Sequence, residues 1–251
     1  MDLHELDPTG RFSDRAEDYW RYRPDYPAAA IDAILRGLGD PRRLTAADIG
    51  AGTGISARLL AGRGARVIAV EPNAEMRAAA EPHPRVEWLA ASAEATGLEP
   101  ASLDLLLAAQ AFHWFRAREA LLEFHRVLGP KGRLALMWNT RDRRDPLTRG
   151  YIEAICAVNG EDPAERLPLD PATIHEDGWF SPARAVTFDH GHALDRDGLV
   201  GRAMSDSSVP RRGAAFEEIR LRLEALFDRE RGADGRVVMR YVTRLYLAER
   251  R

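Results

Sequence analysis

The chain has 251 residues, of which 45% are hydrophobic, so it can bury a sizeable core in one large domain or two small ones. Its 36 basic and 39 acidic residues give a formal net charge of -3, which disfavours nucleic acid as a partner because such proteins normally present a basic surface. Lys131 is the one lysine and Cys156 the one cysteine, so a phosphate-binding Gly-Lys-Ser/Thr loop and an internal disulfide are excluded.

The N-terminal part of the sequence predicts a lid followed by a core helix. Residues 12–27 are dense in aromatic side chains and arginines and precede the first expected core element. Each aromatic taken alone could pack on a sheet edge, but the cluster as a whole favours a lid. Residues 27–38 carry apolar side chains at i, i+3, i+4 and i+7, which predicts an amphipathic helix closed by Gly37 and Gly39.

Short apolar strands and amphipathic helices then alternate along the chain. We expect strands at 44–49, 66–70, 86–89, 103–109 and 133–138, and helices at 55–61, from Asn73 as N-cap, and at 116–128. Five strands that alternate with helices predict a parallel sheet covered on both faces. Ligands of such sheets bind at the carboxyl ends of the strands.

Beyond residue 139 the alternation loosens. We expect a helix at 146–158, a proline-containing connection at 161–171, a strand at 183–190, helical stretches at 197–205 and 213–227, and a long closing strand at 237–247. We treat residues 1–251 as a single domain: 1–40 form the lid and first helix, 41–145 the ligand-binding core, and 146–251 the substrate side and closing strands. The insertion-like region at 160–230 is where we expect substrate specificity.

The most informative stretch runs from Asp48 to Gly54 and reads Asp-Ile-Gly-Ala-Gly-Thr-Gly. A strand, a glycine loop and a helix start favour a nucleotide-like ligand, because glycine allows close approach and the helix start has unpaired N–H groups. Glu71 ends the next strand about 20 residues later, the spacing at which an acid meets a ribose diol. The sixth position from Gly50 is Ile55 rather than glycine, which argues against the dinucleotide fingerprint of NAD enzymes.

Further segments that follow other strands agree with this pattern. They are Val70-Glu-Pro72, Ala91-Ser-Ala-Glu94, Ala109-Gln-Ala-Phe-His-Trp-Phe115, Met137-Trp-Asn-Thr-Arg-Asp142 and the lead-in Tyr19-x-x-Tyr-Arg-Pro24. Together they resemble the class I S-adenosylmethionine-dependent methyltransferases, in the branch that methylates bacterial small molecules, with trans-aconitate and ubiquinone/menaquinone methyltransferases as broader relatives. The resemblance is firmest over residues 12–145. It implies a doubly wound, mostly parallel, seven-stranded Rossmann-like sheet with an antiparallel last strand, an N-terminal lid helix and a helical insertion in the C-terminal half.

The resemblance also implies which residues hold the cofactor, S-adenosyl-L-methionine. They are Tyr22, Arg23, Asp48, Gly50, Ala51, Gly52, Gly54, Glu71, Pro72, Met76, Ser92, Ala93, Glu94, Gln110 and Ala111. Glu71 would accept both ribose hydroxyls and Met76 would pack on the adenine, because a thioether is a pliable surface for a flat ring. Ser92 stands where many relatives have aspartate, and its hydroxyl would accept from the exocyclic amine of the adenine.

The other positions divide between the two ends of the cofactor. The Gly50–Gly52 loop would lie against the methionine portion, with Asp48 orienting the loop, and the backbone N–H of Ala93 or Glu94 would donate to the adenine ring. Gln110 and Ala111 would sit beside the sulfonium. Tyr22 and Arg23 would close over the cofactor carboxylate.

Methyl transfer is an in-line displacement in which the protein aligns the acceptor and, where needed, removes a proton. His113 follows the fourth strand and is the candidate general base, because its ordinary pKa near 6.5 suits proton abstraction. Alternatively, His113 forms an aromatic pocket wall with Phe112, Trp114 and Phe115. Proximity alone suffices for many acceptors, so both alternatives stay open.

Two further groups of side chains could be either functional or merely exposed to solvent. His190 and His192 alternate on one strand, but no third and fourth ligand follows at a recognisable spacing, so we expect solvent-facing rings and no metal. Arg141, Arg143 and Arg144 could bind an acidic acceptor such as a carboxylate, but Asp142 and Asp145 make a solvated loop the expectation. The same two interpretations stay open for Arg202, Arg211 and Arg212 in the variable region.

We therefore expect an enzyme that methylates a small-molecule acceptor and releases S-adenosyl-L-homocysteine. The alternatives are a non-catalytic protein that binds either adenosyl compound, and a methyltransferase for a macromolecule, which the acidic balance and the missing Asn/Asp-Pro-Pro-Tyr motif disfavour. A nicotinamide oxidoreductase is a third alternative, but this sequence lacks the glycine spacing that such enzymes need. The polar first ten residues and the absence of an apolar run of ~20 residues predict a cytoplasmic monomer or homodimer without membrane or nucleic-acid partners.

Overall fold

The computed structural model describes residues 16–160, 170–206 and 208–251. Within them lies a seven-stranded sheet with the order β3-β2-β1-β4-β5-β7-β6. The strands are β1 Thr45–Ile49, β2 Arg66–Val70, β3 Val86–Leu89, β4 Leu103–Ala109, β5 Leu128–Arg141, β6 Arg184–Leu194 and β7 Val237–Glu249. β7 runs antiparallel to β5 and β6, and the remaining pairs are parallel. The predicted mostly parallel sheet with an antiparallel last strand is confirmed.

Helices cover both faces of the sheet. They are α1 Ala16–Tyr22, α2 Ala28–Leu35, η3 Pro41–Arg43, α3 Ile55–Gly62, α4 Ala74–Ala78, η4 Phe112–Trp114, α5 Ala117–Val127, α6 Pro146–Asn159, η6 Pro171–Ile174, α7 Arg196–Met204 and α8 Ala214–Glu230. On one face, Ile31 and Ile34 of α2 and Leu60 of α3 join a buried cluster with strand residues, and on the other Phe124 of α5 does so. Burying these apolar side chains between layers holds the sheet and helices together.

Side-chain caps set several helix starts. Asn73 Oδ1 accepts from the Met76 N–H at 2.8 Å at the start of α4, where the sequence predicts an N-cap. Asp145 caps α6 through the Thr148 N–H at 2.8 Å, and Asp195 caps α7 in the same way. Each cap satisfies an N–H group that the first helical turn leaves without an intrahelical partner.

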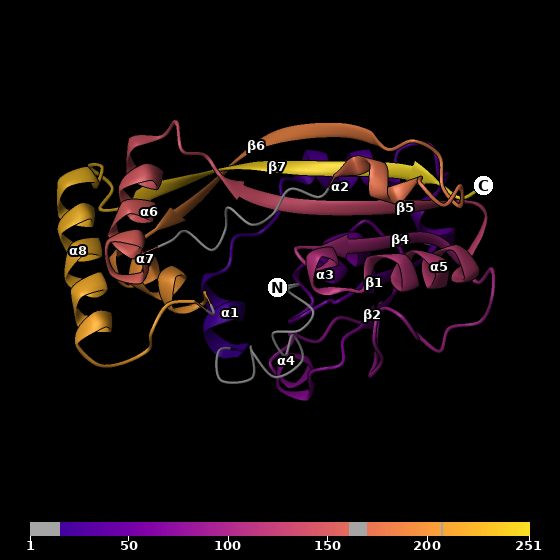
Figure 1. Cartoon of the computed structure of the whole chain (residues 1–251), viewed down its shortest axis with the longest axis horizontal. Helices are drawn as coiled ribbons and strands as arrows, with labels where there is room; N and C mark the ends of the chain where they lie inside the picture. The colour runs from indigo at the N-terminus through magenta and orange to yellow at the C-terminus, as the bar shows by residue number, and fades with distance from the viewer. Residues whose placement is uncertain (1–15, 161–169, 207) are drawn as a thin grey trace.

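The C-terminal helices form a group of their own beside the long strands. In Figure 1, α6, α7 and α8 stack at the end where β5, β6 and β7 extend beyond the shorter strands. Apolar residues of these helices pack with Met239 and Tyr241 of β7 in a third buried cluster. Within the predicted lid segment, α1 lies against α7, and the Tyr22 ring occupies the space that a side chain at Gly201 would need.

Some predicted boundaries are wrong. The strand expected at 133–138 extends from Leu128 to Arg141, because Leu128 pairs with Leu103 of β4 and Arg133–Arg141 pair with β7. The first core helix ends at Leu35, before Gly37 and Gly39 turn the chain with positive φ. Residues 12–15 of the lid segment and 161–169 of the proline-containing connection lie outside the described residues. None of the described helices is both long and apolar enough to cross a lipid bilayer.

Candidate active site

The loop after β1 is fixed to the end of β2 by main-chain hydrogen bonds. The N–H groups of Gly50 and Ala51 donate to the Val70 carbonyl at 2.8 and 3.1 Å. Gly50, Gly52 and Gly54 have φ angles of 67°, 57° and 78°, a region in which side chains with a Cβ are strained. The glycines therefore allow a tight loop at the carboxyl end of β1.

Glu71 connects this loop to the segment that leads into α4. Its Oε2 accepts from the Gly52 N–H and its Oε1 from the Asn73 N–H, both at 2.9 Å. Glu71 is 8% exposed, and this burial raises the pKa of its carboxyl group, although the two N–H donors and Arg77 oppose the rise. Because each carboxylate oxygen can accept more than one hydrogen bond, Glu71 retains acceptor capacity for two hydroxyl groups.

Asp48 lies fully buried at the base of the loop. The Ser56 hydroxyl donates to its Oδ2 at 2.6 Å, and its Oδ1 has no hydrogen-bond partner among the described residues. Burial raises the pKa of Asp48 to about 7, with Ser56 and the Ala57 N–H opposing the rise and the charge of Glu71 adding to it. The carboxyl group of Asp48, under the glycine loop, thus titrates near neutral pH.

The residues predicted for the adenine side surround the ends of β2 and β3. Met76 is 4% exposed and belongs to the first turn of α4. The Glu94 carboxylate accepts from the Arg116 N–H at 2.9 Å and so supports the start of α5. The adenine contact predicted for Glu94 involves its backbone N–H and not this carboxylate. Of the other predicted residues here, Ser92 is half-buried, Ala93 is buried and Pro72 is exposed.

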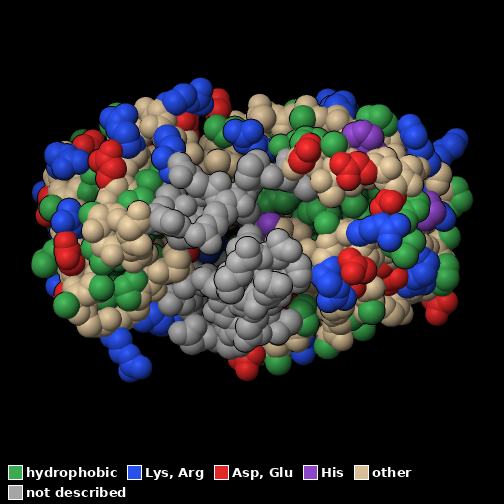
Figure 2. Space-filling model, in the orientation of Figure 1, with side chains coloured by type: hydrophobic (Ala, Val, Ile, Leu, Met, Phe, Trp, Pro, Cys, Tyr) green, Lys and Arg blue, Asp and Glu red, His purple; other side chains and the backbone are tan. Residues whose placement is uncertain are grey.

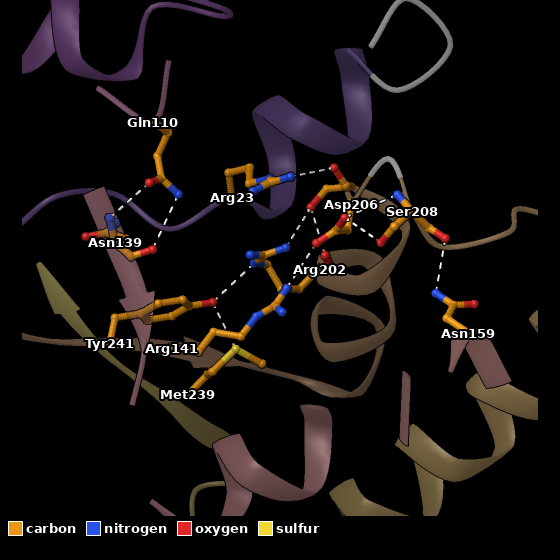
Figure 3. Close-up of polar contacts among 11 residues, drawn as sticks. Arg23, Gln110, Asn139, Arg141, Asn159, Arg202, Asp206, Ser208, Met239 and Tyr241 are labelled. Atoms are coloured by element: carbon orange, nitrogen blue, oxygen red, sulfur yellow. Dashed lines mark hydrogen bonds and ion pairs between the residues drawn. The ribbon is translucent and has the colours of Figure 1, made fainter. Parts of the chain in front are cut away.

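Gln110 and Asn139 join the carboxyl ends of β4 and β5 (Figure 3). Gln110 Oε1 accepts from the Asn139 N–H at 3.2 Å, and the Gln110 N–H donates to the Met137 carbonyl at 2.8 Å. The φ angle of Gln110 is 54°, a left-handed conformation that is uncommon for residues with a Cβ. The Asn139 amide donates to the Asp25 carbonyl at 2.9 Å and accepts from the Thr243 hydroxyl at 2.6 Å. This network fixes the middle of the sheet's ligand-binding edge.

A pocket runs along this edge from the glycine loop to β7. It is lined by Arg23, Pro24, Tyr26, Gly50, Ala51, Ile55, Ser56, Ala109, Gln110, Asn139, Arg202 and Tyr241. The structure thus brings together Arg23, Gly50, Ala51 and Gln110 from the predicted cofactor set. The ring of Tyr22 lies against Gly201 of α7 instead.

His113 is half-buried in η4, next to the β5 side chain of Trp138. The Trp138 indole N–H donates to His113 Nδ1 at 3.2 Å, so a neutral ring carries its proton on Nε2. Burial lowers the pKa of His113 to about 3, and the charge of Arg23 acts in the same direction. In this ring, Nδ1 already accepts a hydrogen bond, Nε2 carries the proton, and the pKa is low. These properties favour the pocket-wall alternative over the general base.

The expectation that Arg141 lies in a solvated loop is wrong, and Arg202, for which the sequence leaves two interpretations open, is buried as well. Arg202 is 3% exposed and the Arg141 side chain 7%. Arg141 pairs with Asp206 at 3.1 Å, and Arg202 donates to the Tyr241 hydroxyl at 3.1 Å and to Ser205 Oγ at 3.2 Å (Figure 3). α7 packs against α1, α8 and β6, which places Arg202 in the interior, whereas Arg144 is 78% exposed and pairs with Asp142 at 2.8 Å as a solvated loop would.

The expectation that His190 and His192 face solvent holds only in part, because both residues are half-buried. His190 Nε2 and His192 Nδ1 are buried and lack a hydrogen-bond partner among the described residues. Burial lowers the pKa of His192 to about 4, and Arg202 contributes in the same direction. No group of three or more His, Cys, Asp or Glu side chains that could hold a metal ion occurs within residues 16–160, 170–206 and 208–251.

Comparison with known proteins connects this site to a family. Residues 47–136 match the family model described as "Methyltransferase domain". An uncharacterized methyltransferase of Schizosaccharomyces pombe is 33% identical over 185 residues, which cover 70% of this chain and 74% of that protein. The chain belongs to the class I S-adenosylmethionine-dependent methyltransferases.

Other relatives of this methyltransferase come from distant organisms. An uncharacterized methyltransferase of Mycobacterium tuberculosis is 41% identical over 166 residues, 64% of each chain. The solved structure of an Anaeromyxobacter dehalogenans protein, named as a type II methyltransferase, is 26% identical with a TM-score of 0.64 and covers 92% of this chain and 98% of that one. The chain spans 57% to 74% of the length of its fission-yeast relatives and 64% of the mycobacterial one.

The family match ends before several residues that line the pocket. It includes the glycine loop, Glu71 and Gln110, but not Asn139, Arg202 or Tyr241. Asn139 lies within one of the quoted sequence segments, yet sequence reasoning gave it no role. Its position directly after Trp138, at the carboxyl end of a predicted strand, was the signal that could have found it.

The buried Asp48 makes the stability of the methyltransferase depend on pH, and Asp48→Asn should remove this dependence. The pKa of the Asp48 carboxyl group is higher in the folded than in the unfolded chain, so protonated Asp48 stabilises the fold at low pH and this stabilisation is lost as pH rises through 7. Relative to wild type, we expect the variant to gain about 2–3 kcal/mol of unfolding free energy between pH 5 and pH 8. Urea denaturation at both pH values measures this difference, and a constant difference would contradict it.

The low pKa of His113 predicts that its imidazole stays neutral from pH 8 to pH 4.5. In NMR spectra, the ring signals identified by their loss in His113→Gln are expected to keep their chemical shifts over this range. Because the unfolded chain binds this proton near pH 6.5 and the folded chain does not, the His113 contribution to stability decreases as pH falls below 6.5. A titration midpoint near 6.5 would instead support the general-base alternative.

Proposed function

We propose that the protein transfers the methyl group of S-adenosyl-L-methionine to a small-molecule acceptor by in-line displacement. One observation supports this most strongly: a single pocket extends from Gly50 across Gln110 and Asn139 to Tyr241. These residues come from the ends of β1, β4, β5 and β7 in the order of those strands in the sheet. Cofactor and acceptor can therefore lie side by side along one edge.

The residues around the glycine loop fit the adenosyl cofactor. Glu71 is fixed by two N–H donors yet can accept two more hydrogen bonds, as a ribose diol requires. Gly50 and Ala51 line the pocket at the end where the methionine portion would lie, and Arg23 lines it with a guanidinium group that suits a carboxylate. Glu71, the loop and Arg23 would thus hold the ribose, the methionine chain and the carboxylate.

When bound, the cofactor supplies a methyl group already activated by its sulfonium. The protein then has to align the acceptor and exclude water. Gln110 and Asn139 hold the ends of β4 and β5 in fixed register beneath the pocket. Arg23, Pro24 and Tyr26 line the same pocket from the segment between α1 and α2, and the Asn139 amide fastens this segment through the Asp25 carbonyl.

The covered pocket favours a small acceptor over a macromolecule. Tyr26 is 8% exposed and Arg202 3%, so residues of the pocket wall lie beneath the surface. A nucleic-acid strand or a folded protein would have to displace the segment between α1 and α2 to reach Gln110. A small molecule can enter without that displacement.

Isothermal titration of the purified protein with S-adenosylmethionine, S-adenosylhomocysteine and NADH tests the cofactor. We expect the two adenosyl compounds to bind and NADH to give no heat. Conversion of S-adenosylmethionine to S-adenosylhomocysteine, measured by mass spectrometry with a panel of small metabolites, then tests turnover. Failure of both adenosyl ligands to bind would refute the proposed function, and binding without turnover on any acceptor class would support a non-catalytic binder.

A further inference from the structure

One of the two buried arginines, Arg202, lines the end of the pocket away from the glycine loop, and Arg141 lies behind it. Arg202 lines the pocket next to Tyr241, whereas Gly50 and Ala51 line the other end, with Gln110 and Asn139 between them. In Figure 3, Arg141 and Arg202 come from β5 and α7 and lie close to Asp206, which follows α7. We call Arg141, Arg202 and Asp206 the arginine cluster.

Arg202 is a buried cation whose described hydrogen bonds go to neutral oxygens. It is 3% exposed and donates to Tyr241 Oη at 3.1 Å and to Ser205 Oγ at 3.2 Å. A guanidinium carries five N–H donors and stays charged, so it retains donors for a further acceptor. A buried charge is costly unless charged or strongly polar groups complement it.

The carboxylate of Asp206 is shared among several guanidinium groups. Burial would raise its pKa, but Arg141, Arg23 and Arg202 lower it well below its ordinary value, so Asp206 is ionised. Its ion pair at 3.1 Å is with Arg141. Among the residues that the structure describes, the cluster therefore combines more positive than negative charge at the pocket end.

A second observation marks the same place. The hydroxyl group of Tyr151 has no hydrogen-bond partner among the described residues, although the residue is 0% exposed. Its ring lies under the Arg141 guanidinium at 5.1 Å, and burial raises the pKa of its hydroxyl group although the charges of Arg202 and Arg141 oppose the rise. A buried hydroxyl beside two guanidinium groups suits an oxygen-bearing ligand, which would accept hydrogen bonds from these donors.

The positive charge of the cluster is a property of the interior rather than of a basic surface. On the face shown in Figure 2, exposed basic and acidic side chains lie among one another. His190 and His192 add no charge, because burial lowers the pKa of both rings. An anion attracted by Arg202 and Arg141 would therefore be a small one that enters the pocket.

We propose that the methyl acceptor carries a compact oxyanion, a carboxylate or a phosphate group, which Arg202 binds with the support of Arg141 and Tyr151. This proposal rests on the proposed function, because it assigns the acceptor to the end of the pocket opposite the cofactor. The oxyanion anchors the acceptor near β7, and its nucleophilic atom then points back over Gln110 and Asn139. Arg23, which lines the same pocket and donates to the Ser205 carbonyl at 2.9 Å, is the residue that we assign to the cofactor carboxylate.

Titration of the protein saturated with S-adenosylhomocysteine tests the proposal with three probes. These are malonate, inorganic phosphate and neutral malonamide, each followed by calorimetry. We expect malonate or phosphate to bind at least about 10-fold more tightly than malonamide, because only the anions make charge-assisted hydrogen bonds. Preference for malonate indicates a carboxylate acceptor, and preference for phosphate indicates a phosphorylated one.

Variants assign the binding to Arg202. Arg202→Met is expected to weaken binding of the preferred anion at least about 20-fold, and Arg202→Lys, which keeps charge but not the planar fork, about 3- to 10-fold. Arg144→Met makes the same charge change on an exposed side chain and should leave anion binding within about twofold of wild type. Tyr151→Phe removes the lone hydroxyl and should weaken anion binding severalfold while the melting temperature stays the same or rises.

Several results would overturn the proposal. One is equal binding of malonamide and the anions, and another is no anion binding by wild type. A third is unchanged anion affinity in both Arg202→Lys and Tyr151→Phe. These two variants keep the test informative if Arg202→Met does not fold. Loss of S-adenosylhomocysteine binding in Arg202→Lys would show that Arg202 serves the cofactor instead. If wild type does not bind S-adenosylhomocysteine, the proposed function fails, and titration of the unliganded protein still reports on Arg202.

Discussion

Replacing Glu71 by alanine is expected to weaken S-adenosylhomocysteine binding by about 2–3 kcal/mol, or roughly 30- to 150-fold in Kd. Two effects combine. The ribose hydroxyls lose their acceptor, and the N–H groups of Gly52 and Asn73 lose the carboxylate that holds loop and α4 together. Isothermal titration measures the change directly.

The matched control is Glu87→Ala. Glu87 is an exposed glutamate on β3 that pairs with Arg66 at 3.0 Å, so its loss changes the net charge equally without touching the loop. We expect this control to keep wild-type affinity. An affinity of Glu71→Ala within threefold of wild type would remove Glu71 from the proposed cofactor site.

Gly50→Ala is expected to be the most damaging single-methyl change in the loop. A Cβ at Gly50 would lie 2.7 Å from the Ala111 Cβ and 3.0 Å from Phe115 Cζ, and the φ angle of 67° disfavours any side chain. Backbone strain of about 1–2 kcal/mol and overlap of about 1–3 kcal/mol should both reduce the free energy of unfolding. Relief of the overlap would shift the loop, so cofactor affinity should fall as well.

Gly37→Ala separates the two causes. Gly37 has a φ angle of 85°, but a Cβ there would meet no atom within 4 Å. We expect this variant to lose only the strain component, about 1–2 kcal/mol, and to keep cofactor affinity. Equal destabilisation by the two substitutions in chemical denaturation would mean that contact with Ala111 is unimportant.

The parts of the structure that depend on local chemistry could be predicted from the sequence. The N-cap at Asn73 and the positive φ angles of the glycine loop follow from residues within one turn of each other. The parallel order of the core strands follows from the alternation of strands and helices. The family resemblance added the antiparallel last strand, which no local pattern indicated.

The acceptor side could not be predicted, because its contacts join distant segments. Arg23 donates to the Ser205 carbonyl 182 positions later, and Asn139 to the Asp25 carbonyl 114 positions earlier. A local pattern places an arginine on a helix but does not tell whether another helix covers it. The same reason explains His190 and His192: their shared strand face was predicted, and its burial was not.

The order of strands in the sheet also has a consequence for how the protein is made on the ribosome. In the described sheet β6 pairs with β7, and β7 lies between β6 and β5 although it is synthesised after both. The strands that carry the glycine loop, Glu71 and Gln110 can therefore associate early, whereas β6 waits for its neighbour until Val237–Glu249 emerges. We expect the nascent chain to acquire its cofactor cradle first and Tyr241, the far wall of the pocket, last.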